Sequence, residues 1–207
     1  MRILTTPSSR RLAVLGMGFA AALASFLPPL ADIAQELFAA HMVQHLLLIA
    51  VAAPLLVAGG LELAVPPLAG WALFVGLFLF WHWPLAFRWA ALDPLTAALE
   101  LASILFAALC FWSGVLGRSA LNDGGRALLV MTAAVLTDLP GVVMVFAPTP
   151  ICTMPGENAS AFHMTPLADQ QLAGLLMWVP ANLVFFSIAT FLFARWMGPA
   201  RGPMVTS

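Results

Sequence analysis

Six runs of about 20 mainly apolar residues dominate this sequence, and each is long enough to cross a lipid bilayer as one helix. Only 8% of the 207 residues are charged and 62% are hydrophobic, which is far too apolar for an ordinary water-soluble domain. The sequence therefore predicts a single all-α domain, a polytopic membrane bundle of about six transmembrane helices. The predicted spans lie near residues 11–28, 41–59, 68–87, 95–117, 126–148 and 168–195.

Two helix starts and one long loop are marked by local motifs. Asp93 before Pro94, and Thr165 before Pro166, each combine an N-cap residue with a proline in the first helical turn. Residues 148–167 are rich in Pro, Gly, Asn and Ser, a composition that predicts an irregular loop between the fifth and sixth spans.

The first apolar run allows two interpretations. Arg10 and Arg11, a short apolar stretch and the sequence Ala22-Leu23-Ala24 also resemble a signal peptide with a small-residue cleavage site. Cleavage would leave five spans and would not change the orientation of the others.

The arginines predict the orientation of the bundle, because short cytoplasmic loops retain positive charge. If the N-terminus is cytoplasmic, seven of the eight arginines fall on the cytoplasmic side and only Arg88 falls outside. We therefore expect both termini in the cytoplasm and the segments 28–40, 88–94 and 148–167 outside. The chain has no lysine and its arginines form no basic stripe, which argues against a nucleic-acid partner.

Three histidines are predicted to meet at the outer end of the bundle. His41 and His45 open the second span, and their spacing of four places both imidazoles on one helical face. His82 lies near the outer end of the third span. Because an ionisable residue inside a membrane is costly and is usually kept for function, metal binding is the favoured hypothesis. A structural polar cluster, haem ligation and a proton relay stay open as alternatives.

Sulfur side chains lie on the same predicted side of the membrane. His163 stands in the long outer loop beside Met164, and Cys152 and Met154 come a few residues earlier. Imidazole suits copper and zinc alike, whereas thiol and thioether groups favour Cu(I). Copper, as Cu(I), is therefore the first candidate metal and zinc the second. Taken singly, each sulfur residue is better explained as an ordinary loop residue.

Carboxylates accompany the histidines. Glu100 and Asp169, with Gln170 beside it, lie near the outer end, and Asp138 lies deeper in the fifth span, before Pro140. Such a carboxylate could hold an arriving cation or orient a ligating histidine. Alternatively, Asp138 accepts hydrogen bonds from a neighbouring helix, and Asp169 and Gln170 favour the positive end of the sixth helix.

Three motifs occur in order along the chain: HMVQHLLL at 41–48, HWP at 82–84 and DQQLAGLLMW at 169–178. Together they resemble the CtaG family of multi-span cytochrome c oxidase assembly factors, over about residues 38–195. An unrelated single-span copper chaperone that shares this name is not meant. The resemblance assigns His41, His45, His82 and Asp169 to family motifs. It implies a protein of the bacterial inner membrane, with haem-copper oxidase subunits and periplasmic copper chaperones as partners.

The resemblance and the residues together predict a non-enzymatic assembly factor that receives copper at the periplasmic face and passes it to an oxidase or its chaperones. One rival is a zinc-dependent intramembrane hydrolase, in which Asp169 or Asp138 activates a zinc-bound water. A second is a haem-binding membrane cytochrome with His45 and His82 as axial ligands. A third is a scaffold that needs no metal.

Overall fold

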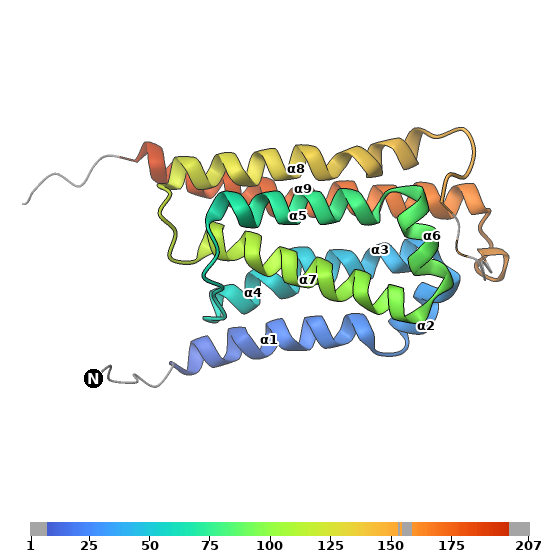
Figure 1. The fold of residues 1–207 in the computed structure, drawn as a ribbon, viewed down its shortest axis with the longest axis horizontal. Helices are drawn as coiled ribbons and strands as arrows, with labels where there is room; N and C mark the ends of the chain where they lie inside the picture. Colours follow the sequence, from blue (N-terminus) through green and yellow to red (C-terminus); the bar gives the residue numbers. More distant parts are fainter. Residues whose placement is uncertain (1–7, 153, 155–158, 199–207) are drawn as a thin grey trace, which may run out of the picture.

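The computed structural model describes residues 8–152, 154 and 159–198, and within these ranges every regular element is a helix. The predicted all-α class is therefore confirmed. The long helices lie side by side along the long axis of the molecule, while α2 and α6 lie at one end (Figure 1). The elements are α1 (Ser9–Phe26), α2 (Leu30–Glu36), α3 (Phe38–Leu46), η1 (Leu47–Ala52), α4 (Ala53–Ala58), α5 (Pro67–Trp81), α6 (Pro84–Leu92), α7 (Pro94–Leu116), α8 (Asp123–Phe146), η2 (Ala159–Phe162) and α9 (Pro166–Met197).

Four continuous helical segments are long and apolar enough to cross a membrane, and the count rises to six if each of two bent pairs is one span. The first pair, α1 and α2, bends by 41°, and the second, α5 and α6, bends by 74°. The predicted count of about six spans is reached when each bent pair is counted as one span. The four continuous segments are Phe38–Ala58, Pro94–Leu116, Asp123–Phe146 and Pro166–Met197.

The third predicted span, 68–87, is interrupted in the structure. Pro84 has no backbone N–H and disfavours a helical conformation of the residue before it. Trp83 is accordingly extended, with ψ 132°, and α5 ends at Trp81 while α6 starts at Pro84. His82 therefore stands at a helix break, and α6 crosses the end of the bundle (Figure 1).

The two predicted N-caps are present. Asp93 accepts a hydrogen bond from Thr96 N at the start of α7, and Thr165 accepts one from Ala168 N at the start of α9. The predicted outer loop 148–167 contains the short 3-10 helix η2, and residues 153 and 155–158 of this loop lie outside the described residues.

The segment of α3, η1 and α4 forms the centre of the bundle, since 72% of its span is buried against 28% for α8 and 22% for α9. A π-helix interrupts it at Leu47, two residues after His45. Pro54 offers no N–H to the carbonyl one turn earlier, so the helix widens, and Ala53 N donates to Leu48 O. The indole N–H of Trp112 donates to Ile49 O at 2.7 Å and satisfies a carbonyl of the widened turn.

Candidate metal centre

His41 and His45 lie one helical turn apart on α3, as their spacing predicts, with ring centroids 4.6 Å apart. Both side chains are buried, and His45 is only 2% exposed. Helix α3 therefore presents a pair of imidazoles to the inside of the bundle near one of its ends.

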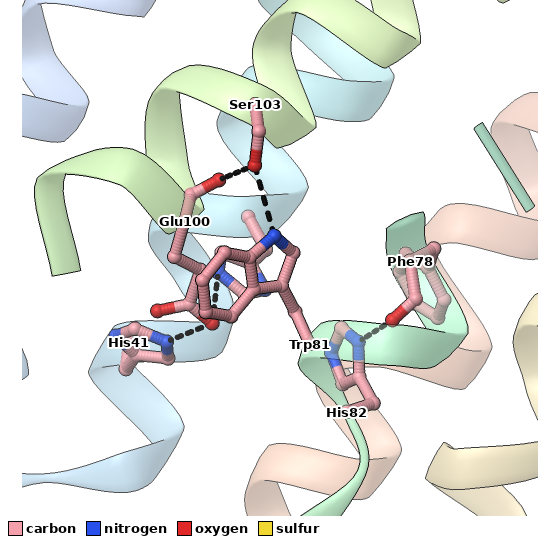
Figure 2. A network of polar contacts seen from close by, with 7 residues as sticks. His41, Phe78, Trp81, His82, Glu100 and Ser103 are labelled. Carbon is pink, nitrogen blue, oxygen red and sulfur yellow. Dashed lines mark hydrogen bonds and ion pairs between the residues drawn. The ribbon is translucent and has the colours of Figure 1, made fainter. Parts of the chain in front are cut away.

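Glu100 on α7 completes a cluster with this pair. Its Oε1 lies 3.4 Å from His41 Nε2 and 3.5 Å from His45 Nε2, and the side chain is 1% exposed. Figure 2 shows the Glu100 carboxylate facing His41 across the gap between the two helices. The sequence suggested a supporting role for Glu100, whereas the structure places it among the candidate ligands.

His82 approaches the cluster from the break between α5 and α6, and its ring centroid lies 5.4 Å from that of His45. Its Nδ1 lies 2.7 Å from Phe78 O (Figure 2). Since a carbonyl only accepts, Nδ1 carries the hydrogen, and in the neutral ring Nε2 keeps a free lone pair. This Nε2 is buried and has no hydrogen-bond partner among the described residues. A backbone-anchored imidazole with a free Nε2 is the usual state of a metal-ligating histidine.

The geometry of the cluster fits a metal ion. Two ligands about 2.0 to 2.1 Å from a tetrahedral metal are about 3.3 Å apart, close to the observed contacts of 3.4 and 3.5 Å. One ligand atom from each of His41, His45 and Glu100 lies within 4.8 Å of the other two. Three imidazoles and one carboxylate are donors that copper and zinc accept.

Unpaired polar atoms support the same conclusion. Both ring nitrogens of His45 and Oε2 of Glu100 are buried without a hydrogen bond in the described part of the chain. Leaving a buried polar group unsatisfied costs about 1 to 3 kcal/mol, so such groups in proteins are normally paired. A bound cation would satisfy several of them at once.

Two hydrogen bonds in series connect Trp81 to the backbone of Glu100. Trp81 Nε1 donates to Ser103 Oγ at 2.9 Å, and Ser103 Oγ donates to the backbone oxygen of Glu100 at 3.0 Å (Figure 2). Trp81 and Ser103 were not predicted as site residues. The only sequence signal is their position, next to His82 and three residues after Glu100.

Asp169 of α9 supports the site from the start of α3. Its two carboxylate oxygens accept hydrogen bonds from the backbone N–H groups of Phe38 at 2.7 Å and Ala39 at 2.9 Å. Asp169 therefore acts as an N-cap supplied by another helix, and it fixes the helix that carries both imidazoles.

Gln170 fixes the outer loop. Its Oε1 accepts hydrogen bonds from Ile151 N and Cys152 N, and its Nε2 donates to Met144 O at 3.1 Å.

Asp138 takes no part in the histidine cluster. Asp138 is half-buried and accepts a hydrogen bond of 2.9 Å from Asn182 on α9. This agrees with the alternative in which Asp138 accepts hydrogen bonds from a neighbouring helix.

The predicted sulfur ligands are dispersed. Met154 is buried and lines a cavity of about 490 Å³ whose wall includes His41. Cys152 is also buried, and burial raises the pKa of its thiol to about 11, so the thiol is protonated at neutral pH. Met164 packs against a separate apolar cluster around Leu37, and His163 is exposed with a φ of +57°. Met154 therefore shares a cavity wall with a histidine of the cluster.

The chain is similar to a known protein family over nearly its whole length. The family model described as cytochrome c oxidase caa3 assembly factor matches residues 2–65 and 60–198, nearly the whole chain. No curated protein and no solved structure gave a match. The family match confirms the resemblance drawn from the three motifs and supports a role in cytochrome c oxidase assembly. The chain belongs to the family of cytochrome c oxidase caa3 assembly factors.

Proposed function

We propose that this protein binds a copper ion in the buried cluster of His41, His45, His82 and Glu100, and passes it to a cytochrome c oxidase or to its copper chaperones during assembly. The observation that carries the proposal is the convergence of His41 Nε2 and His45 Nε2 on one carboxylate oxygen of Glu100, inside a membrane bundle. The role is that of a metal carrier rather than an enzyme.

The residues around the cluster suit a cargo that enters and leaves. Met154 and His41 line one cavity, so a Cu(I) ion could meet the soft thioether before it reaches the imidazoles. Within the cluster, the carboxylate of Glu100 would offset the positive charge where little water can do so. His41 both lines the cavity and contacts Glu100, so it stands between the entry side and the buried ligands.

The arginines indicate the side of the membrane on which copper would be bound. Arg10, Arg11, Arg118, Arg126 and Arg195 all lie near the end of the bundle opposite to the histidines. With this arginine-rich end in the cytoplasm of a bacterium, the cluster lies at the periplasmic side of the inner membrane, and both termini are cytoplasmic. Periplasmic copper chaperones and oxidase subunits are then the natural donor and acceptor.

The two metal-dependent rivals have less support. The predicted zinc hydrolase uses Asp169 or Asp138 to activate water, but Asp169 uses both oxygens to cap α3, and Asp138 pairs with Asn182 away from the histidine cluster. A haem between His45 and His82 would need a cavity large enough for its porphyrin ring. The cavity beside His45 measures only about 30 Å³, and the ring of His82 stacks on Phe78 at 4.1 Å.

A complementation experiment tests the proposal. In cells that lack this protein, the double variant His45→Ala/His82→Ala should fail to restore the copper content and activity of the oxidase. The matched control is His163→Ala, because His163 is an exposed histidine outside the buried cluster, and it should restore both. Full restoration by the double variant would refute copper handling and would favour a metal-free scaffold.

A further inference from the structure

Gln44 lies between the two histidines of α3 and contacts a different helix from them. Its Nε2 donates a hydrogen bond of 2.6 Å to the backbone oxygen of Ser25, in the last turn of α1, whereas both histidines contact Glu100 on α7. Gln44 is 4% exposed and Ser25 is completely buried. The bond therefore joins the helix that carries the histidines to the end of the first helix.

The backbone oxygen of Ser25 needs this donor because of the prolines that follow it. In a continuous helix this oxygen would accept a hydrogen bond from the N–H of residue 29, but residue 29 is proline and has no N–H. Accordingly, α1 ends at Phe26 and α2 begins at Leu30, with a bend of 41° between them. A buried carbonyl without a donor costs free energy, so such groups are normally paired. Gln44 supplies the donor that proline lacks and fixes the break between α1 and α2 against α3.

The break between α1 and α2 forms one wall of the cavity that leads to His41. The cavity has a volume of about 490 Å³ and runs from the exposed residues Gln35 and Leu92 to the buried side chain of His41. Helices α6 and α7 form the opposite wall. The wall from α1 and α2 consists of Phe26, Ala31, Ala34 and Gln35. Because Gln44 holds this wall against α3, its hydrogen bond sets the width of the cavity beside His41.

We propose that Gln44 is a positioning residue for the metal path: by holding the wall of α1 and α2 in place, it limits how fast a copper ion passes between the surface and His41. The inference rests on the proposed copper role and assigns a residue to the path of the ion instead of to its ligands. A movement of the wall away from α3 breaks the bond to Ser25. Loss of this bond should therefore speed entry and release by the same factor and leave the affinity of the cluster unchanged. The net strength of one hydrogen bond corresponds to about twofold to tenfold.

Two leucine variants separate the wall from the rest of the cavity. Gln44→Leu removes the amide at nearly the same side-chain volume. Gln35→Leu is the matched control, because Gln35 lines the same cavity but donates within its own helix, to Ala31 O at 3.3 Å.

Alkylation of an introduced thiol tests the wall without metal. The thiol comes from Ala90→Cys, in a chain that also carries Cys110→Ser and Cys152→Ser. Ala90 lines the opposite wall and is 4% exposed, so a reagent must pass through the cavity to reach it. N-ethylmaleimide should alkylate this thiol about twofold to tenfold faster with Gln44→Leu, and at an unchanged rate with Gln35→Leu.

Copper kinetics test the path itself. Bicinchoninate, which binds free Cu(I) and changes colour, follows the release of copper from the loaded protein. Compared with the wild type, Gln44→Leu should load and release copper about twofold to tenfold faster and retain an equal amount at equilibrium. Gln35→Leu should match the wild type in all three measurements.

An alkylation rate in Gln44→Leu equal to that of the wild type would overturn the proposal, as would faster alkylation with unchanged copper rates. A lower copper affinity without a change in alkylation would make Gln44 a ligand, which also contradicts it. If Gln44→Leu does not accumulate, Gln44→Asn gives the same comparison, because its amide is one methylene too short to reach Ser25. A wild type that binds no copper would refute the copper role, while the alkylation rates would still decide whether Gln44 holds the wall.

Discussion

Replacing Asp169 by alanine should loosen the start of α3 and with it the candidate metal centre. The substitution leaves the N–H groups of Phe38 and Ala39 buried without their acceptors. A hydrogen bond to a charged group contributes about 1.5 to 3 kcal/mol, and removing an N-cap side chain costs about 0.5 to 2 kcal/mol. With two such bonds lost from one buried cap, we expect a destabilisation of about 3 kcal/mol.

Thermal unfolding of the purified protein in detergent measures this effect. For a chain of this size each kcal/mol shifts Tm by about 2 to 4 °C, so Asp169→Ala should unfold about 6 to 12 °C lower. Asp169→Asn keeps one acceptor oxygen and should lose about half as much. Asp93→Ala is the matched control, because Asp93 caps α7 from an exposed position and its loss should shift Tm much less. If Asp169→Ala unfolds at the wild-type temperature, the cross-helix cap does not stabilise α3.

Two further predictions concern the outer loop and the α8 and α9 contact. Because burial raises the pKa of the Cys152 thiol to about 11, alkylation of Cys152 in a Cys110→Ser variant should be slow at pH 7, and its rate should rise about tenfold per pH unit toward pH 11. Mass spectrometry follows the reaction, and fast alkylation at pH 7 would contradict the burial. Gly174→Ala places a Cβ 2.7 Å from Gly141 O, and the overpacking should cost about 1 to 3 kcal/mol in thermal unfolding. Gly76→Ala, where no atom lies within 4 Å of the added Cβ, should not be destabilised, and equal Tm values for the two variants would show that the glycine contact is not tight.

The helical bundle could be predicted because its signal is local. Long apolar runs separated by turn residues specify membrane helices with little reference to the rest of the chain. The spacing of His41 and His45 placed both rings on one face for the same reason. The break at His82 was also visible in Pro84, yet the apolar run 68–87 continues across it and masked the change of direction.

The composition of the site could not be predicted in full, because it depends on how each helix is rotated about its own axis. Nothing near Glu100 in the sequence shows that α7 turns this residue toward α3, since the rotation is set by packing against the other helices. The cap that Asp169 supplies to α3 joins residues about 130 positions apart and has the same origin. The dispersal of the sulfur residues reflects an irregular loop, whose path no periodicity encodes.

Copper loading of the purified protein tests the central claim most directly. After incubation with Cu(I) and removal of unbound metal, the wild type and the His163→Ala control should each retain one copper ion per chain. X-ray absorption should show nitrogen or oxygen ligands at about 2.0 to 2.2 Å. The double variant His45→Ala/His82→Ala should retain almost none. Equal copper in the double variant and the wild type would contradict a metal centre built on these histidines.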